Sequence, residues 1–591
     1  MSYWKIFLFF KFSYLLKISV ICVTIKFMKK FLILTILVFL FSFTVAASDS
    51  VRESVTYQNA GLLIITQPGE NGRVTSSANI SILGASDPDF PLYINGEEVK
   101  TTLNGFFTLY AELESGKNVF IFTNGENEET ITVIQEPPEP YLPPVTIYFE
   151  VPIYGAVEND NISRFADFDD DLKMRTPLAR GTIVKIIAER GEFYVIEDET
   201  CIFKKDVYML DRAVPEITVT EGRTQKTDNG VSVLFNVSDN PLYSLELEGE
   251  KALLSLYAND QTDSWTGLYS FDDGYIKQIK KTASYELSIY SFTFEKPPVG
   301  YAVGFYDGVM EVEFRYAATS LSEAAVLLDA GHGGTDPGAL GPPGEFGPME
   351  KDFNLYVAGV ARDYLEQLGV EVTFIREYDE YINIMERIAH FDRGNRFDIS
   401  VCVHTNSMPL SSDFSSDDGP LMFYTLDLSE KAADDMIRLI ASETGNHYRA
   451  PKRQNFAMAR YTAAPSMLFE MGFMCNPEDY ERLLETGYLD LMGEALGKSI
   501  ELYLTQTAEI SGIIHDFREI EEPEPNFETE PEEEPAVPAI GGQGEQEAEL
   551  PPASGYDDFG RGVKIFIIII LFMFFGGAAL FWKNKDSLNI K

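Results

Sequence analysis

The sequence predicts a multidomain protein in which three small all-β modules are followed by an α/β domain with a mainly parallel sheet and by a C-terminal transmembrane helix. At roughly 150 residues per domain, the 591 residues of the chain correspond to about four domains. Up to residue 320, short alternating apolar runs are separated by turn signals, whereas beyond it apolar strands alternate with segments of helical period. Near the C-terminus, 18 uncharged residues run from Ile565 to Trp582.

The charge balance excludes one broad class of partner. The chain holds 47 Lys and Arg against 92 Asp and Glu residues, a net charge of −45. Such a surface repels phosphate backbones, so we expect no nucleic-acid binding. A hydrophobic content of 45% is too high for a mostly disordered chain, and the domains should therefore fold.

The N-terminal segment 1–47 has the pattern of a cleaved secretory signal. Met28 and two lysines precede an uncharged stretch from Phe31 to Val45, and the small residues that cleavage requires follow at Ala46 and Ala47. Initiation at Met28 would give this signal an ordinary length. We therefore expect the remainder of the chain to be exported.

Three β-rich modules are expected after the signal. Residues 51–135 alternate in apolar character and resemble an Ig-like β-sandwich, and a proline-rich linker, 136–144, separates them from an SH3-like barrel at 145–212. Residues 213–320 continue in strands and resemble the AMIN-like modules that precede wall amidases. We expect such modules to serve targeting or to contact a protein regulator. Their hairpin signals are the Asn-Gly pairs that begin at Asn71, Asn95, Asn104 and Asn124.

The α/β domain is expected over residues 321–507. Its apolar strands read AAVLLDA, VEVTFI, DISVCVH and PSMLFEMGF, and alternation of strands with helices predicts a parallel sheet covered on both faces. Ligand sites in such sheets lie at the carboxyl ends of the strands. One helix is predicted from the apolar stripe formed by Phe353, Val357, Val360, Tyr364 and Leu368.

The C-terminal part predicts attachment to a membrane. Residues 508–562 are acidic and proline-rich and should form an extended stalk. Residues 563–582 are just long enough to cross a hydrocarbon core of about 30 Å. Lys583 and Lys585 then place the tail, 583–591, in the cytoplasm, with the α/β domain outside and facing the cell wall. The alternative is a sortase signal, which LPPASG at 550–555 distantly resembles.

Cysteine usage indicates no disulfide framework. After removal of the signal only Cys201, Cys402 and Cys475 remain, widely separated. Cys402 lies in an apolar run and is predicted to be a small buried side chain, not a nucleophile.

Two histidines and two glutamates mark a candidate metal site. His332 and His404 each follow an apolar strand, so both imidazoles should project from one edge of a parallel sheet. Two imidazoles suit zinc, which also needs an anionic ligand. Glu350, in the first helical turn after Pro348, is the candidate third ligand. Glu470 stands within an apolar strand and could serve as the general base of metal-assisted hydrolysis.

Taken singly, each of these residues has a structural explanation. Each histidine could be a hydrogen-bonded structural residue, Glu350 could be a solvated helix-end carboxylate, and Glu470 could belong to a buried salt bridge. Only the combination favours a site.

Five motifs occur together from Val326 to about Leu504: LLDAGHGG, MEKDFNL, MERIAHFDRGN, SVCVHTNS and MLFEMGFMCNPEDYERLL. In this order they resemble the zinc-dependent N-acetylmuramoyl-L-alanine amidases of the bacterial cell wall. The resemblance implies that Zn²⁺ is bound by His332, Glu350 and His404, and that Glu470 handles protons. It implies a scaffold or substrate-supporting role for Arg387, Asn395 and Asn406.

The implied reaction is hydrolysis of the amide that joins N-acetylmuramic acid to L-alanine in peptidoglycan. Two alternatives stand beside it. An inactive wall-binding scaffold would lack the metal, and a zinc peptidase would cut within the stem peptide instead.

Overall fold

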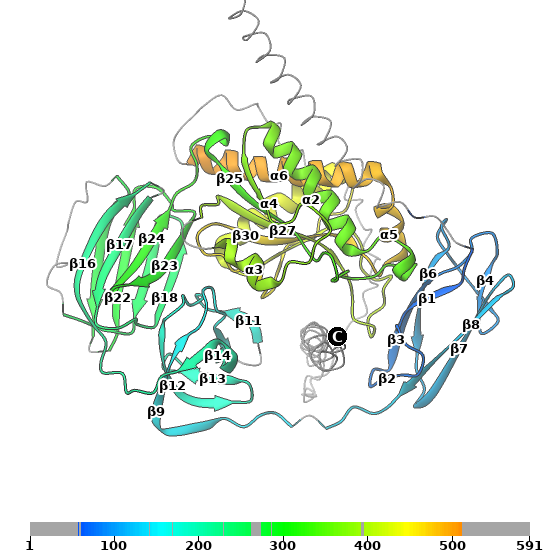
Figure 1. The fold of residues 1–591 in the computed structure, drawn as a ribbon, viewed down its shortest axis with the longest axis horizontal. Helices are drawn as coiled ribbons and strands as arrows, with labels where there is room; N and C mark the ends of the chain where they lie inside the picture. Colours follow the sequence, from blue (N-terminus) through cyan, green and yellow to red (C-terminus); the bar gives the residue numbers. More distant parts are fainter. Residues whose placement is uncertain are drawn as a thin grey trace, which may run out of the picture.

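The computed structural model describes residues 57, 61–140, 142–167, 170–228, 230–261, 274–284, 286–391 and 395–510. The predicted signal peptide, transmembrane helix and cytoplasmic tail lie outside these residues, as does nearly all of the predicted stalk. Among the described residues, no helix combines the length and the apolar character needed to cross a bilayer. The expected order of β-rich modules followed by an α/β domain is confirmed (Figure 1).

The first module is a sandwich of two sheets. One sheet has the order β1-β3-β6 and the other the order β2-β8-β7-β4-β5. At the predicted turn between β4 and β5, Asn95 and Gly96 both have positive φ, 51° and 86°, as a tight hairpin requires. The strands are β1 (Ile64–Gln67), β2 (Arg73–Thr75), β3 (Asn79–Ala85), β4 (Leu92–Ile94), β5 (Glu97–Val99), β6 (Phe106–Glu112), β7 (Gly116–Asn124) and β8 (Asn127–Gln135).

The second module is one seven-stranded sheet of order β11-β10-β14-β13-β12-β9-β15. Within this sheet, Phe193 packs against Phe203 with ring centroids 4.4 Å apart. The strands are β9 (Ile147–Val157), β10 (Phe165–Asp167), β11 (Asp170–Met174), β12 (Ile183–Arg190), β13 (Phe193–Ile196), β14 (Cys201–Phe203) and β15 (Val207–Met209).

The third module is a second sandwich, with sheets of order β20-β16-β17-β24-β23 and β18-β19-β22-β21. Its buried side chains and those of the second module form one continuous apolar cluster, so the two modules share a core. The strands are β16 (Thr218–Thr227), β17 (Gly230–Val237), β18 (Tyr243–Glu248), β19 (Lys251–Leu256), β20 (Asn259–Asp260), β21 (Ile276–Ala283), β22 (Ser288–Phe294), β23 (Gly300–Tyr306) and β24 (Val309–Arg315).

The α/β domain is built on a six-stranded sheet of order β26-β25-β27-β30-β28-β29. Every pairing is parallel except that of β28 with β30, so the predicted mainly parallel sheet is confirmed. The strands are β25 (Ala325–Ala330), β26 (Glu371–Phe374), β27 (Ile399–Asn406), β28 (Leu421–Tyr424), β29 (Lys452–Arg453) and β30 (Ser466–Phe473).

Long helices cover one face of this sheet (Figure 1). They are α2 (Glu350–Gln367), α4 (Asp427–Thr444) and α6 (Thr486–Ile510), and α5 (Pro477–Leu483) lies beside them. On α2 the predicted apolar stripe is present, since Phe353 and Val357 are fully buried. The other face is covered by α3 (Ile384–Ile388), by the short 3₁₀ segments η4 (Ala389–Phe391) and η5 (Ala457–Ala459), and by Ala302 of β23.

Candidate metal centre

Three neighbouring parallel strands carry the candidate residues. In the pairing of β25 with β27, Ala330 lies opposite Val403, so His332 follows the end of β25 while His404 lies near the end of β27. In the pairing of β27 with β30, His404 lies directly opposite Glu470. The sheet therefore brings three of the four residues to its carboxyl edge, as the strand pattern predicts.

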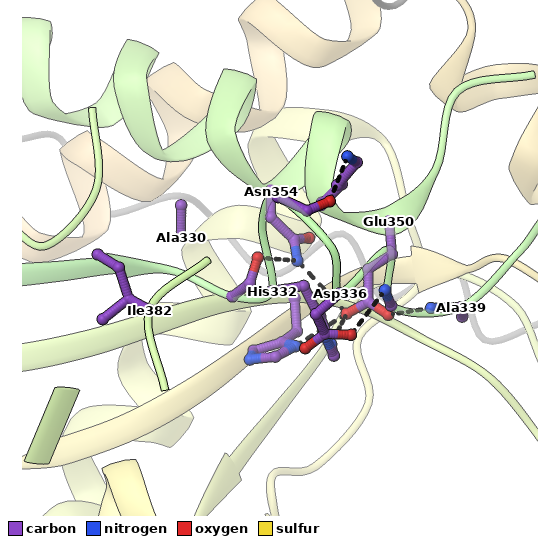
Figure 2. Close-up of polar contacts among 12 residues, drawn as sticks. Ala330, His332, Asp336, Ala339, Glu350, Asn354 and Ile382 are labelled. Carbon is purple, nitrogen blue, oxygen red and sulfur yellow. Dashed lines mark hydrogen bonds and ion pairs between the residues drawn. The ribbon is translucent and has the colours of Figure 1, made fainter. Parts of the chain in front are cut away.

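The fourth residue, Glu350, reaches this edge from the first position of α2 (Figure 2). Its Oε1 lies 3.1 Å from Nε2 of His332 and 2.8 Å from Nδ1 of His404. The candidate ligand atoms of the three residues all lie within 4.8 Å of one another. The structure thus brings together the ligand set that the sequence suggests.

Glycines make this approach possible. A Cβ at Gly331 would lie 2.3 Å from the His404 ring, and one at Gly333 would lie 2.2 Å from the carbonyl oxygen of Glu380. His332 itself has a φ of 60°, a conformation that is uncommon for a residue with a side chain and that marks functional sites. The glycines on either side of His332 are therefore required by close packing, in addition to the role of His332 as a candidate ligand.

Glu350 is buried and extensively hydrogen-bonded, so the solvated alternative is wrong for it. Its Oε2 accepts a hydrogen bond of 2.7 Å from the Ala339 amide, and its Oε1 accepts one of 3.3 Å from the Thr405 amide. Asn354, one turn further along α2, donates from Nδ2 to Oε1 of Glu350 and to the Gly331 carbonyl. These contacts orient the carboxylate toward both histidines.

The electrostatics of the cluster favour a carboxylate among imidazoles. Burial opposes ionisation of Glu350, but His332 and His404 outweigh it and hold the pKa of Glu350 well below its ordinary value. Burial likewise opposes protonation of His332, yet Glu350 and Asp336 raise its pKa to about 10. Asp336 lies 2.9 Å from Nδ1 of His332 and so leaves Nε2 facing the cluster, the arrangement by which carboxylates orient metal-binding histidines.

Glu470 forms no salt bridge within the described residues, so the structure does not bear out that alternative. Its side chain is buried, and its Oε2 has no hydrogen-bond partner there. Burial, together with repulsion from Glu350, raises the pKa of Glu470 well above its ordinary value. An orphaned carboxylate oxygen beside two imidazoles and a carboxylate is the environment expected beside a bound divalent cation. The residues present therefore fit zinc.

Arg387 contacts the end of β25 and the backbone of His332. Its buried guanidinium pairs with Asp329 of β25 and donates to the backbone carbonyls of Ala330 and His332. The scaffold role that the resemblance implies suits these contacts better than a substrate-binding one.

Asn406 and Asn395 lie in different surroundings. Asn406 ends β27, and its Oδ1 accepts a hydrogen bond of 2.7 Å from the Ser407 amide, so it shapes the following loop. Asn395 is exposed and outside a helix, and it donates to the His390 carbonyl. Asn395 therefore lies beyond α3, which ends at Ile388.

Sequence reasoning missed Asp336, Asn354 and Arg376. Arg376 is buried and donates from Nη2 to the carbonyls of Gly331 and Lys351, the neighbours of two candidate ligands. Burial and the adjacent Arg387 lower the pKa of Arg376 to about 10, so it stays charged at neutral pH. The arginine directly after an apolar strand was the available signal. Cys402 is buried as expected, although its thiol also donates to Asp329.

Comparison with known proteins agrees with this geometry. Residues 326–502 match the family described as N-acetylmuramoyl-L-alanine amidase. The "Uncharacterized protein YqiI" of Bacillus subtilis is 31% identical over 195 residues, which cover 32% of this chain and 89% of that protein. The chain belongs to this amidase family. It is therefore an enzyme of the N-acetylmuramoyl-L-alanine amidase class.

Two further proteins are similar to part of this amidase. The "Probable cell wall amidase LytH" of Staphylococcus saprophyticus is 23% identical over 261 residues, 43% of this chain and 85% of that protein. The catalytic domain of CwlV, an N-acetylmuramoyl-L-alanine amidase of Bacillus (Paenibacillus) polymyxa, is 28% identical. The match covers 31% of this chain and 98% of that one, with a TM-score of 0.29.

Removal of the Arg387 guanidinium should destabilise the amidase domain strongly. In Arg387→Met, the fully buried Asp329 loses its salt-bridge partner and, within the described residues, keeps only the Cys402 thiol as a donor, and breaking a buried pair in this way costs about 3–5 kcal/mol. Lys431→Ala, which breaks an exposed pair with Asp435 on α4, should cost only about 0.5 kcal/mol. Urea unfolding of the two variants measures the difference, and equal midpoints would contradict the structural role of Arg387.

Proposed function

We propose that this amidase hydrolyses the amide between the lactyl group of N-acetylmuramic acid and L-alanine in peptidoglycan, with zinc as its cofactor. The observation that carries the proposal is the convergence of His332, Glu350 and His404 with Glu470 on the adjacent strand. The first three residues would hold the zinc, and Glu470 would serve as the general base. The family match supports the same bond as the target.

The chemistry divides between the cofactor and the chain. When bound, zinc supplies Lewis-acid polarisation of the scissile carbonyl and activation of water near neutral pH. The positive charge of a cation held by the neighbouring ligands would offset the burial that raises the pKa of Glu470 and favour its ionised form. Glu470 Oε2 would then take the proton from the attacking water and later deliver it to the departing amine of L-alanine. Burial keeps this carboxyl away from bulk solvent, so that the proton stays with the reacting groups.

The base can be tested separately from the ligands. Glu470→Gln keeps the size of the side chain but cannot accept the proton, so turnover on purified peptidoglycan should fall by about 10²–10⁴-fold while elemental analysis still finds zinc. His332→Ala should lose both zinc and turnover. Wild-type turnover in Glu470→Gln would remove Glu470 from the mechanism, and a wild-type protein without zinc would favour the inactive scaffold.

The products identify the bond that is cut. Digestion of peptidoglycan with the full chain should release stem peptides that begin with free L-alanine and leave sugars without peptide. Mass spectrometry of the muropeptides distinguishes this from stem-peptide cleavage. Shortened stems still attached to muramic acid would show a peptidase instead.

The location of the enzyme is a further part of the proposal. The signal pattern at 1–47 and the uncharged run from Ile565 to Trp582, followed by Lys583 and Lys585, support a single-span membrane protein with its amidase domain outside. In cell fractions the mature chain should sediment with membranes, and a chain stopped at Gly562 should be released. A mature C-terminus near residue 553 would indicate sorting to the wall and contradict the permanent span.

A further inference from the structure

The loop that follows β27 packs against the N-terminal sandwich. This segment, residues 407–414, begins immediately after Asn406 and three residues after His404; we call it the β27 loop. It is distant in sequence from the sandwich, yet several hydrogen bonds join the two. Figure 1 shows the sandwich beside the amidase domain, with β3 and β6 facing it.

The β27 loop lies against the edge of β3, in one sheet of the sandwich. Strand β1 pairs with β3 only from Leu83 to Ala85, so β3 is uncovered on that side before Leu83. There the Ser81 amide donates a hydrogen bond of 2.7 Å to the Leu410 carbonyl. The Leu410 side chain packs against the apolar core of the sandwich. The loop thus covers the edge of β3 where β1 stops.

The Ser81 hydroxyl secures the same loop from within the interface. Ser81 is completely buried. Its Oγ donates a hydrogen bond of 2.7 Å to the Ser412 carbonyl and accepts one of 3.3 Å from the Phe414 amide. A buried hydroxyl that satisfies two backbone groups of another domain fixes their position.

Beneath the loop, the sandwich meets the end of β30, the strand that carries Glu470. One buried apolar cluster is formed by Leu83 of the sandwich, Phe414 of the loop, Phe473 at the end of β30, and Cys475 just after it. The Met408 amide donates to Sγ of Cys475 at 3.3 Å. Movement of the loop would therefore uncover Cys475.

The sandwich also holds the segment that leads into Glu350. The Thr66 hydroxyl donates a hydrogen bond of 2.6 Å to the Pro342 carbonyl. Phe106 packs edge-on against Tyr480 of α5, with ring centroids 5.2 Å apart, and the Tyr480 hydroxyl donates to the Pro348 carbonyl at 2.9 Å. Both segments that border the metal-binding cluster are thus joined to one module.

We propose that the N-terminal sandwich is a positioning element of the active site, with Ser81 as its principal positioning residue, and not a detachable spacer. It holds the β27 loop, and through it the approach to the ligand cluster, in the geometry needed for turnover. The expected effect on turnover rests on the proposed amidase function. The positioning of the β27 loop by the sandwich does not depend on that function.

The test uses the full chain and two variants on the same interface. Ser81→Ala removes both buried hydroxyl bonds. Tyr110→Phe is the matched control, because Tyr110 is exposed and its hydroxyl donates a hydrogen bond of 3.3 Å to the Ser411 carbonyl of the same loop. If Ser81→Ala does not fold, Leu410→Ala, which withdraws the loop side chain from the sandwich core, replaces it.

Two readouts follow the loop and the site separately. The first is alkylation of Cys475 by iodoacetamide at pH 8, read by mass spectrometry with Cys402 as an internal standard. Burial raises the pKa of Cys475 to about 11, so the wild type should react slowly. The second is kcat and KM on a soluble N-acetylmuramoyl peptide, with zinc content measured alongside.

In Ser81→Ala, Cys475 should be alkylated about tenfold faster than in the wild type, while the labelling of Cys402 stays unchanged. The kcat of this variant should fall about tenfold with its zinc content unchanged, since small misplacements near a site can lower the rate by up to ~100-fold. Tyr110→Phe should match the wild type. Unchanged labelling, or fast labelling with wild-type kcat, overturns the proposal, as does an equal effect in Tyr110→Phe. Wild-type protein without amidase activity would refute the proposed function, while the labelling would still decide whether the sandwich holds the loop.

Discussion

The parallel pairing of β25, β27 and β30 is the constraint on which the rest of the site depends. Because side chains alternate along a strand, a slip of one residue would turn His404 or Glu470 to the opposite face of the sheet. The observed register puts His404 opposite Glu470 and carries His332 to the same edge. The positions of these two residues are therefore specified by backbone hydrogen bonds among buried, mostly apolar strands.

Burial of charge sets the second requirement. Glu350 and Asp329 are ionisable groups with almost no exposed surface, and each is stable there only because its partners are preorganised. Glu350 has two imidazoles and backbone amides, and Asp329 has Arg387. The guanidinium groups of Arg376 and Arg387 also donate hydrogen bonds to the backbone carbonyls of Gly331 and His332. The same groups that satisfy buried charge also hold the loop that presents a candidate ligand.

The accessory modules are packed into the molecule more closely than a string of separate domains would be. The second and third modules share one apolar cluster, and Gly300 of β23 approaches the backbone of Ala463 so closely that a Cβ there would lie 2.3 Å away. Ala85 and Phe106 of the first sandwich belong to the same core as the α2 helix. Contacts of this kind restrict how freely the modules can move relative to the amidase domain.

By itself, the sequence determined the order of β-rich modules and α/β domain, the helix over Phe353 and Val357, and the four residues of the candidate centre. These follow from local periodicity and from residue types at strand ends, which short windows of sequence contain. The tertiary structure alone decided that Arg376, Asn354 and Asp336 support the ligands and that Ser81 holds the β27 loop. Such roles depend on which backbone groups the fold brings together from distant parts of the chain. Ser81 and Ser412, for example, are more than 300 residues apart, and no short stretch of sequence predicts a contact between them.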